Sequence, residues 1–151
     1  MLQDQLCAVS WKSRPRSFVG LMTLYESNYI RLGWLVRDPR RLPDRALSVV
    51  EGDSPLELAV VERARYTTTA TLSYLFEEQG ATLRDPGLEL RVYHDARLAE
   101  VTAVGPARAG LARIQSQLPR SADGRWSVNM LLNKWLEYCA DCGHGFVHVP
   151  A

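Results

Sequence analysis

The sequence predicts an α+β domain, in which an antiparallel β-meander of four to five strands is packed on one face by N- and C-terminal amphipathic helices. Two observations lead to this fold class. Apolar residues recur at spacings of three and four near both ends of the chain, as on one side of a helix. In the middle of the chain they alternate with polar residues, as on half-buried strands, and short turns between these segments favour antiparallel neighbours.

Composition limits the class of protein. The chain has 151 residues, which suits one domain, and we expect a flexible leader at residues 1–16 and a single α+β domain at residues 17–151. Its 18 lysines and arginines nearly balance its 17 aspartates and glutamates, so we expect no nucleic-acid partner. No stretch approaches the roughly 20 apolar residues of a membrane span, and an odd number of cysteines favours a reducing compartment. We therefore expect a cytoplasmic protein with no membrane segment.

Helices are expected on both sides of the meander. An apolar stripe places a helix of about five turns at residues 18–36, and the sequence DPRRLPD at residues 38–44 ends it. Pro106 opens a second helical segment, PARAGLARIQSQL. The last helix carries an apolar stripe from Val128 to Cys142 and ends at the glycine that follows.

The strands follow from alternation. They are expected at ALSVV (46–50), LELAVVER (56–63), TTTATLSYLF (67–76) and LELRVY (88–93). Residues 77–87, EEQGATLRDPG, are expected to form a loop. Thr67, Thr69 and Thr71 share a face with Ser73, and this face is predicted to be a solvent face, with a homodimer interface as the alternative.

The stretch RVYHDARLAEV, residues 91–101, is predicted to form the last hairpin. With Asp95 and Ala96 as the turn, the expected pairs are His94 with Arg97, Val92 with Ala99, Arg91 with Glu100 and Leu90 with Val101. This register turns the apolar residues inward and leaves Arg91 and Glu100 as an ordinary outer pair. A longer loop is the alternative, because the turn lacks the glycine that two-residue turns favour.

A polar cluster at two turns is the candidate site. The RARY and HDAR turns should emerge at one end of the sheet, which would gather the candidate ligand-binding residues Arg65, Tyr66, Thr68, His94 and Asp95. Arginine with neighbouring hydroxyl groups suits a phosphate or carboxylate, and histidine can titrate near neutrality. Strand parity turns both His94 and Glu62 inward, so Glu62 rather than Asp95 is the expected carboxylate partner of His94. Charged turn residues are, however, usually solvated, and a buried Glu-His pair could be structural.

Three functions remain open on this basis. The first is a binding or regulatory module, with a small anionic ligand at the turn cluster. The second is a hydrolase or transferase acting on a phosphate-bearing substrate, with His94 and Glu62 as catalytic acid and base and Arg65 as the anion clamp. The third is a purely structural interaction domain. The common nucleotide, hydride-transfer, acyl-transfer and zinc-protease motifs are absent from the sequence.

The motif CADCGHGFVH raises the question of a metal site. Its cysteines and histidines, Cys139, Cys142, His144 and His148, could bind zinc, and the C-x-x-C pair could carry redox chemistry. Both cysteines also lie on the apolar stripe of the last helix, where free cysteine behaves as a small hydrophobic residue. We interpret them as core cysteines and expect no metal and no cofactor.

Four blocks, LMTLYESNY, VERARYTT, RVYHDARLAEV and LLNKWLEYC, resemble in this order the signature blocks of the YqiB-like family of uncharacterised proteobacterial proteins. The resemblance extends from Phe18 to Gly145, and it implies a domain of unknown function without an assigned activity. The positions that match are Tyr25, Glu26, Asn28, Glu62, Arg65, Tyr66, Thr67, Thr68, Tyr93, His94, Asp95, Glu100, Trp135, Tyr138 and Cys139. Cys142, His144 and His148 fall outside the pattern.

Overall fold

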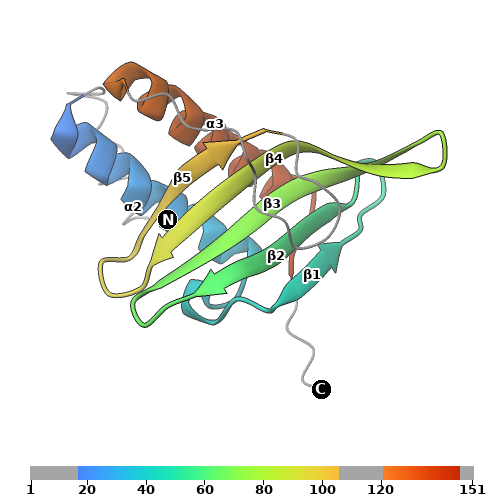
Figure 1. Ribbon diagram of the computed structural model, residues 1–151, viewed down its shortest axis with the longest axis horizontal. Helices are drawn as coiled ribbons and strands as arrows, with labels where there is room; N and C mark the ends of the chain where they lie inside the picture. The colour runs from blue at the N-terminus through green and yellow to red at the C-terminus, as the bar shows by residue number, and fades with distance from the viewer. Residues whose placement is uncertain (1–16, 106–120, 147–151) are drawn as a thin grey trace.

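The computed structural model describes residues 17–105 and 121–146. Its elements are α2 (Phe18–Leu35), the 3-10 helix η1 (Pro39–Arg41), β1 (Arg45–Ser48), β2 (Leu56–Arg63), β3 (Thr67–Glu78), β4 (Ala81–Tyr93), β5 (Leu98–Val104) and α3 (Ala122–Asp141). The strands form one antiparallel sheet in the order β1-β2-β3-β4-β5, and Figure 1 shows α2 and α3 side by side next to β5. The predicted α+β meander with an N-terminal and a C-terminal helix is confirmed.

Some sequence predictions concern residues beyond this description. The leader at residues 1–16, the helical segment that opens at Pro106 and His148 lie outside the described residues. Among the helices that are described, none is long and apolar enough to cross a membrane.

Both long helices begin at a serine cap. The side chain of Ser17 accepts a hydrogen bond from the backbone N–H of Gly20, and Ser121 does the same for Gly124. At the other end of α3, Gly143 has a φ of 94°, a left-handed conformation that glycine adopts without steric cost. The predicted end of the last helix is thus confirmed, although α3 starts before the apolar stripe, at Ala122.

The main core lies between the inner face of the sheet and the two helices. Its largest fully buried side chains are leucines and valines of both layers: Leu32, Leu56, Leu58, Leu72, Leu88, Leu90, Val92, Val101, Leu132 and Leu136. The inward direction predicted for Leu56, Leu58, Leu90 and Val92 is therefore correct. Burial of this apolar surface is the main contribution to the stability of the fold.

Strand β5 is an edge strand, and helix side chains occupy its free edge. Asn28 of α2 donates from Nδ2 to the carbonyl of Ala99 at 3.2 Å, while Oδ1 of Asn129 on α3 accepts from the N–H of Val101 at 2.9 Å. The two asparagines contact each other at 3.3 Å, and Asn133 of α3 donates to Asn28 at 3.1 Å. These amides satisfy buried backbone groups that another strand would otherwise pair.

The loop predicted at residues 77–87 is wrong. Strands β3 and β4 continue through this region and pair as far as Glu78 and Ala81, so that the hairpin extends beyond the neighbouring strands in Figure 1. Gln79 and Gly80 have φ values of 53° and 79°, which is the geometry of a two-residue turn that matches the twist of the strands. Pro86 is accommodated because it lies at an irregularity in the β3–β4 pairing.

The solvent face predicted for the threonine row is also wrong. Thr69 and Ser73 are only 2% and 1% exposed, and Thr71 is buried as well. The same face holds the buried carboxylate of Glu57, which forms ion pairs with Arg45 and Arg84 at 2.6 and 2.7 Å. Apart from the partly exposed Thr67, this row is therefore buried. The alternation of apolar and polar residues indicates that this face is polar, but it does not indicate whether the face is exposed.

Candidate functional site

The two turns of the predicted cluster are neighbours in space. Thr67 pairs with Tyr93 across β3 and β4, and the N–H of His94 donates to the carbonyl of Tyr66 at 3.0 Å. The predicted β4–β5 pairs of Leu90, Arg91 and Val92 are all present. The turn itself is the longer alternative, since residues 94–97 all lie outside the strands and Arg97 has a φ of 55°.

His94 has a hydroxyl partner and not a carboxylate. Its Nε2 atom lies 2.9 Å from Oγ1 of Thr68, which is buried on the inner face of β3. Its Nδ1 atom is buried and has no hydrogen-bond partner in the described part of the chain. This arrangement places His94 on the inner face of the sheet, as strand parity predicted.

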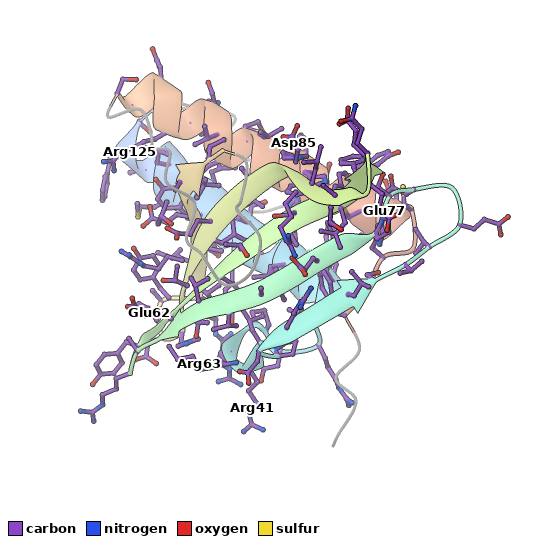
Figure 2. The ribbon with its side chains drawn as sticks, turned by 45° about the vertical axis from the view of Figure 1, so that its right-hand side comes forward. Arg41, Glu62, Arg63, Glu77, Asp85 and Arg125 are labelled. Carbon is purple, nitrogen blue, oxygen red and sulfur yellow. The ribbon has the colours of Figure 1, made fainter. Side chains whose placement is uncertain are left out.

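Glu62 does not follow the predicted parity. Val60 pairs with Ala70, but the next pair is Glu62 with Thr69, so that Val61 is an extra residue in β2. The bulge turns Glu62 to the face opposite His94 and puts Arg63 on the inner face, opposite Thr68. Glu62 and Arg63 are labelled at this end of β2 in Figure 2. The predicted Glu62–His94 pair is therefore wrong.

The remaining residues of the cluster lie at the tips of the turns. Arg65, Tyr66 and Asp95 are all exposed, and the guanidinium of Arg65 lies 5.3 Å from the centre of the Tyr66 ring. Thr68 and His94 are directed inward, away from these tips. The structure thus brings the predicted residues to one end of the sheet but divides them between the solvent and the inner face.

A larger concave site lies beside this end of the sheet. It is a groove of about 1360 Å³ lined by Gly33, Trp34, Leu35, Val36, Arg37, Asp38, Arg40, Arg41, Leu42, Pro43, Arg63, Gly145 and Phe146. We call it the arginine groove, because Arg37, Arg40, Arg41 and Arg63 line it. Its apolar part consists of buried side chains, among them Leu42 and Phe146. Figure 2 shows Arg41 extending from the ribbon on the same side as Arg63.

The end of α2 and the segment after α3 shape this groove together. The backbone of Val36 forms a parallel bridge with Phe146, whose N–H donates to the carbonyl of Leu35 at 2.7 Å. After the helix, the side chain of Asp38 caps η1 by accepting from the N–H of Arg40 at 3.0 Å. These contacts hold the arginine-rich segment 37–41 against an apolar wall.

Two of the four arginines have carboxylate partners. Arg40 lies 3.3 Å from Asp38, and Arg63 lies 2.7 Å from Asp44, a carboxylate that is almost fully exposed. Within the described residues, Arg37 and Arg41 form no ion pair. The backbone N–H of Arg40, together with the arginine charges, holds the pKa of Asp38 below its usual value. The groove therefore has an excess of positive charge.

A second, smaller cavity lies under α2 beside the β4–β5 turn. Its volume is about 290 Å³, and it is lined by Glu26, Tyr29, Ile30, Gly33, Pro39, Ala96 and Arg97. We call it the turn cavity. Burial raises the pKa of Tyr29, and among nearby charges Asp38 acts in the same direction while Arg40 and Arg97 oppose it. Gly33 lines both the turn cavity and the arginine groove.

A buried chain of Ser48, His144 and Asp53 resembles a hydrolase triad in its residue types. Oγ of Ser48 lies 2.8 Å from Nδ1 of His144, and Nε2 of His144 lies 2.9 Å from Asp53. The two ring nitrogens are reversed relative to a Ser-His-Asp triad, in which serine contacts Nε2. The His144 side chain is 0% exposed, and none of these three residues lines the arginine groove or the turn cavity. These three residues therefore have a structural role.

Ser48, His144 and Asp53 hold the segment after α3 against the sheet. Besides contacting His144, Ser48 accepts from the N–H of Gly145 at 3.0 Å, and Asp53 accepts from the hydroxyl of Tyr74 at 2.8 Å. The neighbouring Phe146 is thereby positioned at the arginine groove. His144 stood out in the sequence only as a zinc candidate, and no local signal pointed to β1 as its partner.

Of the two described cysteines, only Cys139 belongs to the core, as was predicted for both. Cys139 is fully buried, Cys142 is partly buried, and burial raises the pKa of the Cys139 thiol to about 11. Among the described residues, no group of three or more histidine, cysteine, aspartate or glutamate side chains could hold a metal ion.

The arginine groove was missed at the level of sequence. Residues 37–41, RDPRR, were interpreted only as the end of a helix, although three arginines in five positions were a signal of local positive charge. Arg63 could not be assigned to this site, because the bulge that turns it inward leaves no polar pattern in the sequence.

Residues 31–145 match the family described as "Protein of unknown function (DUF1249)", which is most of the chain. The chain belongs to the DUF1249 family. It is 31% identical over 140 residues to "Uncharacterized protein YqiB" of Escherichia coli strain K12, an alignment that covers 88% of this chain and 94% of the relative. The protein of the same name from Escherichia coli O157:H7 gives the same values. No solved structure matches this DUF1249 chain. The resemblance to the YqiB-like family is thus confirmed.

Proposed function

We propose that this DUF1249 protein is a cytoplasmic binding module for a small anionic ligand and that the ligand occupies the arginine groove. The observation that carries the proposal is the position of Arg37 and Arg41, which have no ion-pair partner among the described residues, beside an apolar wall. A guanidinium group presents a planar set of donors that fits a carboxylate or phosphate. Ligand pockets combine such convergent polar groups with a mostly apolar lining.

This proposal places the ligand away from Arg65 and Asp95. These two residues are exposed at the tips of the turns and line neither the arginine groove nor the turn cavity. The end of β2 next to the turn cluster would contribute Arg63, which the bulge in β2 turns inward. A cytoplasmic location is supported by the odd number of cysteines.

The enzyme alternative requires His94 and Glu62 to act together as catalytic acid and base. Glu62 and His94 lie on opposite faces of the sheet, and His94 contacts Thr68 instead. Neither Glu62 nor His94 lines the arginine groove or the turn cavity. A binding role for the groove needs no such pair and is the function that the geometry supports best.

The test is isothermal titration calorimetry of purified protein with inorganic phosphate and with hexanoate, in a buffer without competing anions. The wild type should bind at least one probe, and Arg37→Ala and Arg41→Ala should each weaken binding about tenfold or more, because a hydrogen bond to a charged group contributes about 1.5–3 kcal/mol. Arg65→Ala is the matched control, since it removes an exposed arginine outside the groove. Urea unfolding should show that all three variants keep wild-type stability to within about 0.5 kcal/mol.

Two results would contradict the proposal. One is a wild-type protein that binds neither probe. The other is an Arg65→Ala variant that loses as much affinity as Arg41→Ala, because this would show that binding follows net charge and not the groove.

A further inference from the structure

We infer that the ligand of the arginine groove is a phosphomonoester that carries a planar aromatic ring, as a nucleoside monophosphate does. Its ring would stack on Trp34, and its phosphate would contact Arg37 and Arg41. The inference rests on the proposed function and adds the chemical class of the ligand. Three features of the groove support it, namely its charge, its aromatic wall and its size.

The first feature is the charge of the groove. Its four arginines have two described carboxylate partners, Asp38 and Asp44, which leaves an excess of two positive charges. A phosphomonoester carries about 1.5–2 negative charges at pH 7, whereas a monocarboxylate carries only one. The charge of the groove therefore matches a phosphomonoester more closely than it matches a carboxylate.

The second feature is Trp34, an aromatic residue in the wall of the groove. It lies in the last turn of α2, is partly exposed and lines the groove together with Arg37. Trp34 and Arg37 are three residues apart, so their Cα atoms lie within about 11 Å of each other. A single small molecule in the groove can therefore contact both residues.

The ring of Trp34 is held in place by Arg31. The guanidinium of Arg31 lies 5.0 Å from the centre of this ring, and it donates to Glu137 at 2.5 and 3.1 Å. Arg31 is buried and does not line the groove, so the surface that Trp34 presents to the groove is not the face that Arg31 covers. A ring that is already fixed loses little side-chain entropy when a ligand stacks on it.

The third feature is size. The groove has a volume of about 1360 Å³, which exceeds the roughly 300–1,000 Å³ of typical small-molecule pockets. Inorganic phosphate would fill only a small part of this volume. The groove therefore has room for an organic group attached to the phosphate, and its buried apolar residues, Leu42 and Phe146 among them, suit the uncharged part of that group.

The experiment compares AMP with ribose 5-phosphate by isothermal titration calorimetry, because the two probes share a phosphate and a sugar and differ in the aromatic base. AMP should bind about tenfold more tightly, as expected for one base stacked on an aromatic side chain. Trp34→Leu should reduce the affinity for AMP to that for ribose 5-phosphate and leave ribose 5-phosphate binding unchanged. Arg41→Ala should weaken the binding of both probes by the same factor, because both carry the phosphate.

Two further variants test whether the ring at position 34 is responsible. Trp34→Phe keeps an aromatic ring and should retain part of the preference for AMP. Tyr66→Leu is the matched control, because Tyr66 is an exposed ring beside Arg65 and outside the groove, and this change should leave the preference intact. Should Trp34→Leu fail to fold, a reduced preference for AMP in folded Trp34→Phe provides the same test.

The possible results separate the two proposals. If inorganic phosphate, hexanoate and AMP all fail to bind, the aromatic phosphomonoester and the anion-binding function are both refuted. If hexanoate binds but neither phosphate ester does, the groove is a carboxylate site and only the phosphomonoester is refuted.

The aromatic part of the inference has its own contrary results. If AMP binds no more tightly than ribose 5-phosphate, or keeps its advantage in Trp34→Leu, the groove remains an anion site and the aromatic ligand is refuted. A loss of the preference in Tyr66→Leu would also refute it, because the base would then stack outside the groove.

Discussion

Replacing Asn129 by alanine should destabilise the protein strongly, because this side chain links α3 to the free edge of β5. Its Oδ1 atom accepts from the buried N–H of Val101 at 2.9 Å, and the side chain also contacts Asn28 at 3.3 Å. Truncation removes both contacts, at about 1 kcal/mol each, and leaves the N–H of Val101 buried and unpaired, at about 1–3 kcal/mol. The expected loss of unfolding free energy is therefore about 3–5 kcal/mol.

Urea denaturation followed by circular dichroism measures this loss, and a domain of this size should lose roughly 2–4 °C in Tm for each kcal/mol. Lys134→Ala is the control on the same helix, because its side chain is exposed and should change stability by at most about 0.5 kcal/mol. Hydrogen exchange at the amide of Val101 should accelerate in Asn129→Ala. A loss below about 1 kcal/mol with unchanged exchange at Val101 would refute the view that asparagines hold the edge of β5.

Three further predictions follow. Trp135→Ala should cost about 3–5 kcal/mol in a urea titration, because Trp135 packs in the core with its ring 5.2 Å from that of Tyr74; wild-type stability would contradict this. Burial alone would raise the pKa of Glu57, but hydrogen bonds from two arginines lower the pKa below its ordinary value of 4.5. Its contribution to stability is present above that pH and is lost as the pH falls through the lowered pKa, so urea midpoints of Glu57→Gln and wild type should converge under acid conditions; a constant difference would argue against it. In native protein, Cys139 should react with a thiol reagent far more slowly than the partly buried Cys142, and equal rates would show that Cys139 is accessible.

The sequence by itself determined most of the secondary structure and the register of β4 and β5 next to their turn. Helices α2 and α3 and most strands follow from apolar periodicity, because side-chain direction along a helix or strand depends only on local backbone geometry. The β4–β5 pairs were predictable for the same reason, since only one register buries Leu90, Val92, Ala99 and Val101 together. The proximity of the two turns followed from strand direction alone.

Burial of polar residues was decided by the tertiary structure. Thr69, Ser73 and Glu57 have the polarity of a solvent face, yet all three are buried. Polarity is a property of each residue, whereas exposure depends on what the rest of the fold places against it. The same reason hid the role of His144, whose partners Ser48 and Asp53 lie far from it in the chain.

The candidate site was decided by one inserted residue and by the packing around it. Because Val60 and Val61 are both apolar, alternation is equally compatible with either register at this point, and only the pairing with β3 shows that Val61 is the bulge. That bulge reverses the faces of Glu62 and Arg63, so the carboxylate of Glu62 lies on the outer face and Arg63 lies on the inner face instead. The groove that Arg63 lines also needs residues 37–41 and Phe146, segments that only tertiary packing brings together.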